Sequence, residues 1–123
     1  MNDAQGAPPL EISPADLAAR LAAAQPAGTP EAPVLIDVRQ PEEHAYVRLE
    51  PSRLVPLPEL AARLDELKSA VDPTADVILY CHHGVRSQHA AVFLRAHGFP
   101  RARSLAGGIE AWTRQVDPSL PRY

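Results

Sequence analysis

The stretch DVILYCHHGVRSQHAAVFLRAHG, residues 76–98, predicts a strand, a tight turn and a helix in direct succession. The apolar run before Cys81 is continuous rather than alternating, which is typical of a strand buried on both faces. Gly84 supplies the backbone freedom that such a turn needs, and Gly98 is placed to end a helix over residues 87–98. We therefore expect Cys81 to lie where the strand ends, in the turn that leads into the helix.

The same alternation of buried strand and helix recurs along the chain. PVLIDVR, residues 33–39, holds a second continuous apolar run, and ARSLAGGIEAW, residues 102–112, predicts a short strand, a double-glycine turn and a final helix. The other expected elements are helices that begin at Ser13 and Pro41, a strand over residues 53–57 and a helix over residues 58–70. This order predicts an α/β fold whose parallel sheet has helices on both faces. In such sheets ligands bind at the carboxyl ends of the strands, where Asp37 and Cys81 fall.

Length and composition bound the possibilities further. We expect residues 1–123 to form one domain, with a flexible N-terminus over residues 1–9, a surface loop over residues 25–33 and a tail over residues 116–123. Lys and Arg number 12 and Asp and Glu 15, with no basic run, so a nucleic acid is not an expected partner. No apolar stretch approaches the roughly 20 residues of a spanning helix. The first residues lack the pattern of a secretion signal, so we expect a cytoplasmic protein without membrane contact.

The chain has a single cysteine, which excludes an internal disulfide and leaves the thiol free for chemistry. A short turn from strand to helix directs its amide groups inward, and together with the positive end of the helix these amides stabilise an anion. The first such anion is the Cys81 thiolate, which we expect to be nucleophilic near neutral pH. Arg86 is placed to hold an incoming oxyanion by two hydrogen bonds. The alternative is a cysteine that only fills space behind a buried strand.

The histidines near Cys81 suggest two further kinds of site, and neither is favoured. His82 and His83 are adjacent loop residues, which usually face different ways, so simple exposure is a better interpretation than proton transfer. A metal site would combine Cys81 with His82, His83 and His89, but no CxxC or HxxxH spacing completes a tetrahedral set. We therefore predict no bound metal.

Three motifs, in this order, resemble those of the single-domain rhodaneses, a family of sulfurtransferases. They are LIDVRQPEEH at residues 35–44, CHHGVRS at residues 81–87 and SLAGGIEAW at residues 104–112, and the similarity runs from about Ile12 onward. The resemblance implies a central parallel sheet of about five strands with helices on both faces. It also implies that Cys81 carries a sulfur atom as a persulfide, without a cofactor. The loop residues that would bind substrate are His82, His83, Gly84, Val85, Arg86 and Ser87.

Other residues are candidates for the pocket or for its support. By the resemblance, Asp37 and Arg39 lie near the mouth or beneath the loop, although such charged pairs more often tie loops together. We expect Arg39 to pair with Glu42 or Glu43. Arg48 stands where family members carry a histidine, in a segment without the usual glycines, so the rim is expected to be more basic. The remaining motif residues have structural interpretations, Gly107 and Gly108 as turn glycines and Trp112 as a core aromatic.

Three functions remain open at this point. The leading one is sulfur transfer from a donor such as thiosulfate to cyanide or a thiol, which includes a thiol on a partner protein. Phosphatases and arsenate reductases of related fold use a similar loop, but they place one residue more between cysteine and arginine than the four of this chain. A rhodanese-like binding or regulatory module without catalysis is the third possibility.

Overall fold

The structure is a computed structural model that describes residues 7–24 and 32–123. The prediction of a flexible N-terminus falls largely on residues 1–6, and that of a surface loop largely on residues 25–31, so both lie mainly outside the described residues.

The centre of the fold is a parallel sheet of five strands, as expected, and its strands lie in the order β1-β5-β4-β2-β3. Its strands are β1 (Glu11–Ile12), β2 (Val34–Asp37), β3 (Arg53–Leu54), β4 (Val77–Tyr80) and β5 (Arg103–Leu105). The pairing of β2 with β4 places Asp37 opposite Tyr80, so the residues that follow these strands emerge at one edge of the sheet. Cys81 is the first residue beyond that edge on the central strand.

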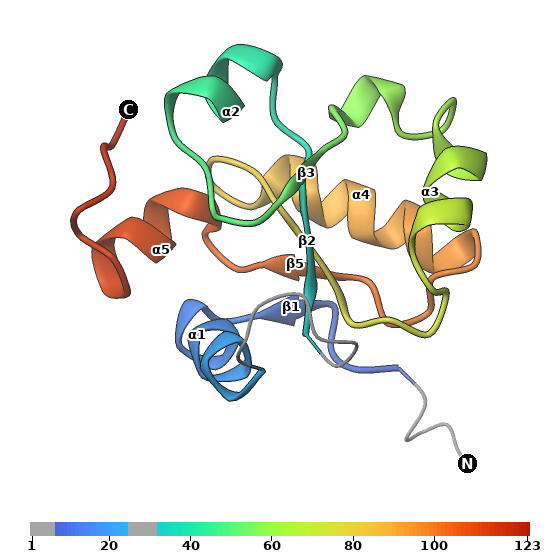
Figure 1. Cartoon of the computed structure of the whole chain (residues 1–123), viewed down its shortest axis with the longest axis horizontal. Coiled ribbons are helices and arrows are strands. Elements are labelled where there is room, and N and C mark those ends of the chain that lie inside the picture. The colour runs from blue at the N-terminus through green and yellow to red at the C-terminus, as the bar shows by residue number, and fades with distance from the viewer. Residues whose placement is uncertain (1–6, 25–31) are drawn as a thin grey trace.

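Helices cover both faces of this sheet (Figure 1). They are α1 (Pro14–Ala23), α2 (Pro41–Tyr46), α3 (Leu64–Ala70), α4 (Val85–Ala96) and α5 (Gly108–Gln115), with a 3-10 turn, η1 (Leu57–Glu59). The predicted cap of α1 is present, because the Ser13 hydroxyl accepts a hydrogen bond from the amide of Asp16. Helices α1 and α5 contact each other on one face, and α4 packs against β4 and β5 on the other.

The prediction for residues 53–70 was wrong in its boundaries. The expected strand ends at Leu54, and the expected helix begins only at Leu64, after η1 and a turn. The residues between them form the 3-10 turn instead, in which Pro58 takes an early position that suits proline. The chain still follows the end of β2, since the amides of Val55 and Leu57 donate to carbonyls of residues 37 and 38 at 2.9 and 3.0 Å.

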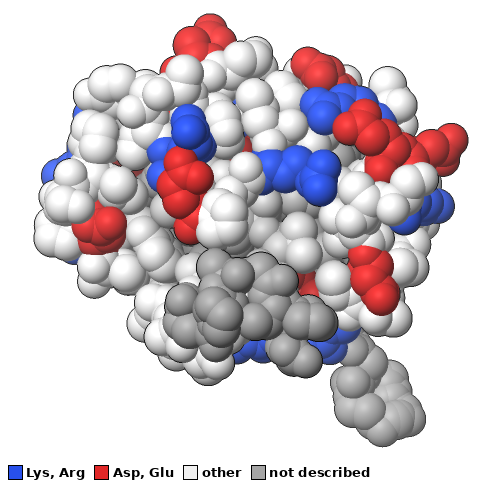
Figure 2. Space-filling view, in the orientation of Figure 1, with Lys and Arg blue, Asp and Glu red and all other residues white. Residues whose placement is uncertain are grey.

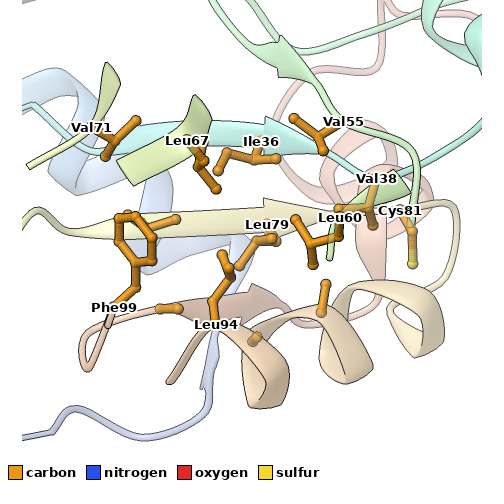
Figure 3. Close-up of a cluster of buried hydrophobic side chains, with 14 residues drawn as sticks. Ile36, Val38, Val55, Leu60, Leu67, Val71, Leu79, Cys81, Leu94 and Phe99 are labelled. Carbon is orange, nitrogen blue, oxygen red and sulfur yellow. The ribbon is translucent and has the colours of Figure 1, made fainter. Parts of the chain in front are cut away.

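The core consists of two clusters, one on each face of the sheet. Residues of β2 and β4 alternate between them: Ile36 and Leu79 belong to the cluster under α3 and α4, and Leu35 and Ile78 to the cluster under α1 and α5. Trp112 is buried in the second cluster, as expected. Cys81 lies at one end of the first cluster, near Val38 and Leu60 (Figure 3). The core therefore supports the reactive end of β4 directly.

The surface carries acidic and basic side chains side by side, without a broad basic area on the face seen in Figure 2. Among the described residues, no helix combines the length and the apolar character that crossing a membrane would require.

We predict that Leu94→Ala lowers the free energy of unfolding by about 3 kcal/mol, because this fully buried side chain of α4 would leave a cavity in the first cluster. Val92→Ala on the same helix is the control: Val92 is 53% exposed, and its loss should cost about 0.5 kcal/mol or less. Urea unfolding measures both. Equal losses would contradict the packing described here.

Candidate active site

The Cys81 sulfur is surrounded by hydrogen-bond donors from its own loop. The amide of Gly84 donates to Sγ at 3.0 Å and the amide of Ser87 at 3.4 Å. Gly84 has a φ of +103°, in the left-handed region, and it caps α4, which begins at Val85 and so earlier than predicted. Two inward amides and the start of a helix together stabilise negative charge on the sulfur.

A pair of buried serines lies beside the sulfur. The Ser87 hydroxyl is 3.4 Å from the Cys81 Sγ and 2.7 Å from the hydroxyl of Ser104 on β5. Ser87 was predicted from the loop, whereas Ser104 was missed. A polar residue inside an otherwise buried strand was the signal that could have found it, because a buried hydroxyl needs a partner.

The N-terminus of α5 holds the loop from outside. The amide of Ile109 donates to the Cys81 carbonyl at 2.8 Å, and that of Glu110 donates to the His82 carbonyl at 3.1 Å. Gly108 makes this approach possible: a Cβ there would lie 2.3 Å from the His82 carbonyl oxygen. The interpretation of Gly108 as a turn glycine is right for its φ of +66°, but incomplete, because its missing side chain also lets α5 reach the loop.

Arg86, at the far end of the loop, is held by a carboxylate of α2. Its Nη1 and Nη2 atoms donate to Oε1 and Oε2 of Glu43 at 2.8 and 3.1 Å. The hydrogen bonds from Arg86 lower the pKa of Glu43 to about 2, against the opposing effect of burial. The prediction that Arg39 pairs with Glu42 or Glu43 was therefore wrong. Glu43 pairs with the loop arginine instead.

Arg39 pairs with Asp37, and both side chains are fully buried. Nε and Nη2 of Arg39 donate to the two carboxylate oxygens at 2.9 and 2.8 Å, and Nη2 also donates to the carbonyl of Val47. Burial lowers the pKa of Arg39, but its hydrogen bonds to Asp37 and Tyr123 outweigh that effect and raise it. This geometry fits a pair that ties β2 to the segment after α2, beneath the site.

The chain matches the rhodanese-like domain family over residues 13–115. It belongs to that family. The cysteine loop, the carboxylate of α2 and the turn before α5 described above all lie within the matched residues.

The chain is related to curated proteins that include a sulfurtransferase. The chain is 36% identical over 102 residues to the adenylyltransferase and sulfurtransferase MOCS3 of Arabidopsis thaliana, a match that covers 73% of this chain and 22% of that protein. It is 35% identical over 89 residues to the chloroplastic rhodanese-like/PpiC domain-containing protein 12 of the same plant, covering 72% of this chain and 30% of that protein. The chain thus spans less than a third of either relative.

Among solved structures, a rhodanese-like domain protein from Staphylococcus aureus superposes with a TM-score of 0.71 at 25% identity, covering 92% of this chain and 97% of that one. The human single-domain sulfurtransferase TSTD1 has the same fold, with a TM-score of 0.74 at 22% identity over 88% of this chain and 98% of that one. The expected rhodanese-like fold is confirmed.

The two histidines of the rhodanese-like loop stack rather than face apart. The rings of His82 and His83 lie 3.9 Å apart at 28°. Burial lowers the pKa of His82, and the charge of His83 and nearby Arg86 adds to that effect. His83 and the neighbouring Val85 are exposed, so the loop presents these side chains to solvent.

Arg48 does not add a free charge to the rim. Its Nε donates to Glu50 at 2.7 Å, and its Nη1 donates to the carbonyl of His44 at 3.1 Å. The expectation of a more basic rim was wrong, because it considered the charge of Arg48 without a neighbouring carboxylate. Glu50 compensates the charge of Arg48 at the surface.

We predict that Gly108→Ala destabilises the domain by about 2–4 kcal/mol, because the new Cβ must displace backbone atoms of Cys81 and His82 and the left-handed φ is strained. Alkylation of Cys81 should slow in parallel. Gly98→Ala is the matched control: it also has a positive φ, but it meets only the flexible Lys68 side chain. It should cost about 1–2 kcal/mol and leave Cys81 alkylation unchanged. Equal effects on Cys81 would contradict the contact described here.

We predict that Arg39→Met costs about 3–5 kcal/mol of unfolding free energy, because it leaves the buried carboxylate of Asp37 without its main partner. Arg48→Met removes an exposed pair and should cost about 1 kcal/mol or less. Urea unfolding at neutral pH compares the two. A small loss for Arg39→Met would refute the supporting role of the buried pair.

Proposed function

We propose that this rhodanese-like domain transfers a sulfane sulfur from a donor such as thiosulfate to cyanide or a thiol, through a persulfide on Cys81. The observation that carries the proposal is the pair of backbone amides directed at Sγ. Such fixed donors are what a sulfur nucleophile needs, since they stabilise the thiolate without a separate base. Two further points support the reading: the family of the chain, and the sulfurtransferase named among its relatives.

The reaction balances in two displacement steps. In the first, the Cys81 thiolate attacks the outer sulfur of thiosulfate, the sulfur–sulfur bond of the donor breaks, and sulfite leaves with the electron pair. In the second, cyanide or a thiolate attacks the outer sulfur of the persulfide, and Cys81 leaves as a thiolate. The products are thiocyanate or a new persulfide. No cofactor takes part, and the amides of Gly84 and Ser87 hold the thiolate before the first step and after the second.

Arg86 is suited to meet an anionic donor. Glu43 uses two of the five N–H groups of its guanidinium, and the side chain is 35% exposed. A sulfonate can therefore contact the remaining N–H groups while Glu43 stays bound. In this arrangement Arg86 orients the donor, and the exposed side chains of His83 and Val85 flank the loop on the solvent side.

The acceptor must come from outside the chain. Cys81 is the only cysteine, so the persulfide cannot be discharged through an internal disulfide. A small thiol, cyanide or a cysteine of a partner protein satisfies the chemistry equally.

We predict that treatment with thiosulfate adds the mass of one sulfur atom to the protein, and that peptide mass spectrometry places it on Cys81. Cys81→Ser should lose this addition and all thiocyanate formation, because a hydroxyl at that position is neither ionised nor a sulfur carrier. Val92→Ala, at an exposed position of α4, is a control that keeps the cysteine, its amide donors and its neighbours. If Cys81 of the folded protein stays unmodified after thiosulfate treatment, sulfur transfer from this donor is refuted.

The same preparations discriminate the other functions. Release of phosphate from an aryl phosphate, lost in Cys81→Ser, would favour a phosphatase; the loop of four residues between Cys81 and Arg86 argues against that outcome. A binding module would keep its partner and its cellular effect in Cys81→Ser. We expect neither result.

A further inference from the structure

The tail that follows α5 returns to the carboxyl edge of the sheet and brings Tyr123 beside α2 (Figure 1). The ring of Tyr123 stacks on His82, with centroids 3.9 Å apart and planes at 7°, and it meets Tyr46 of α2 edge to face. Its hydroxyl accepts a hydrogen bond from Arg39 at 2.7 Å and donates one to Glu43 at 2.8 Å. Tyr123 is therefore fixed by the end of β2, by α2 and by the cysteine loop.

These contacts place Tyr123 across one side of the loop. At the near end of the loop it covers His82, which directly follows Cys81 and stacks in turn on His83. At the far end it shares the Glu43 carboxylate with Arg86, since both donate to Oε2. The rings of residues 83, 82 and 123 and the Glu43–Arg86 pair thus form a continuous wall on the α2 side.

The segment that carries Tyr123 is held less firmly than the helix before it. The N-terminal part of α5 is locked in the core by Ile109 and Trp112, whereas residues 121–123 are all exposed, and Tyr123 itself is 44% exposed. Arg122 pairs with Glu110 at the surface, where an ion pair contributes little. Tyr123 can therefore be removed without loss of the core.

We propose that Tyr123 is a specificity-determining residue, which narrows the access of reagents to the Cys81 sulfur and favours small acceptors over bulky thiols. The proposal rests on the sulfur transfer proposed above. A slim nucleophile such as cyanide needs only a narrow path to the outer sulfur of the persulfide. A larger thiol needs room for the groups around its sulfur, and the ring of Tyr123 stacks on His82, the residue next to Cys81, on the α2 side of the loop.

The test compares Tyr123→Ala, Tyr123→Phe and the wild-type protein with reagents of two sizes. The persulfide form is discharged with cyanide or with glutathione, and the reduced form is alkylated with iodoacetamide or with fluorescein maleimide. In each pair we expect Tyr123→Ala to raise the rate ratio of the bulky to the small reagent about fivefold or more. Tyr123→Phe keeps the ring and should leave both ratios near those of the wild type. Val92→Ala, an exposed apolar residue on α4, is the matched control.

The outcomes separate this proposal from the one on which it rests. If Cys81 forms no persulfide, the proposal of sulfur transfer is wrong. The alkylation ratio still decides whether Tyr123 narrows access to the Cys81 sulfur. If Tyr123→Ala leaves both ratios unchanged, or accelerates small and bulky reagents equally, the proposal is overturned. A variant that lacks residues 121–123 replaces Tyr123→Ala if thermal unfolding shows that the latter does not fold, and it is expected to behave in the same way.

Discussion

The cysteine loop depends on the hydrogen bonds that α5 donates to the carbonyl groups of Cys81 and His82. Peptide groups are planar, and those of the loop are trans, so a carbonyl that points toward α5 turns the following N–H to the opposite side. The amides of His82 and His83 therefore point away from α5. Farther along the loop, the amides of Gly84 and Ser87 reach the sulfur. The contacts with α5 thus fix the orientation of the first two peptide groups of the loop.

The position of β4 in the sheet determines which elements support the Cys81 sulfur. Because β4 is the central strand, Cys81 emerges between β2 and β5, and each neighbour contributes support. On the β5 side, Ser104 binds Ser87, and Gly108 lets α5 approach the loop. On the β2 side, the buried Asp37–Arg39 pair ties β2 to Val47, the residue that follows α2, and so holds the helix that carries Glu43. A buried ion pair is a costly element, and its retention here is consistent with a role in holding geometry rather than in adding stability.

The sequence predicts features that neighbouring residues determine, but it does not predict contacts between residues far apart in the chain. The strand–turn–helix around Cys81, the cap at Ser13 and the parallel sheet follow from periodicity and from local turn chemistry, which neighbouring residues determine. The two-residue strand β1 has no such pattern and exists because it pairs with β5, far along the chain. The same limit explains the wrong partner for Arg39: sequence proximity favoured Glu42 or Glu43, whereas the fold brings Glu43 to Arg86, 43 residues away. The contact between Tyr123 and Glu43 spans 80 residues and has no local signal.

The charge balance of the site is the last constraint on its chemistry. Arg86 is the arginine of the loop, but Glu43 compensates its charge, and Asp37 compensates that of Arg39. The negative charge of the thiolate therefore depends mainly on backbone dipoles, which are fixed by the loop and cannot be taken up by another carboxylate. Donors of this kind can stabilise negative charge on the sulfur without presenting a strong positive field to solvent.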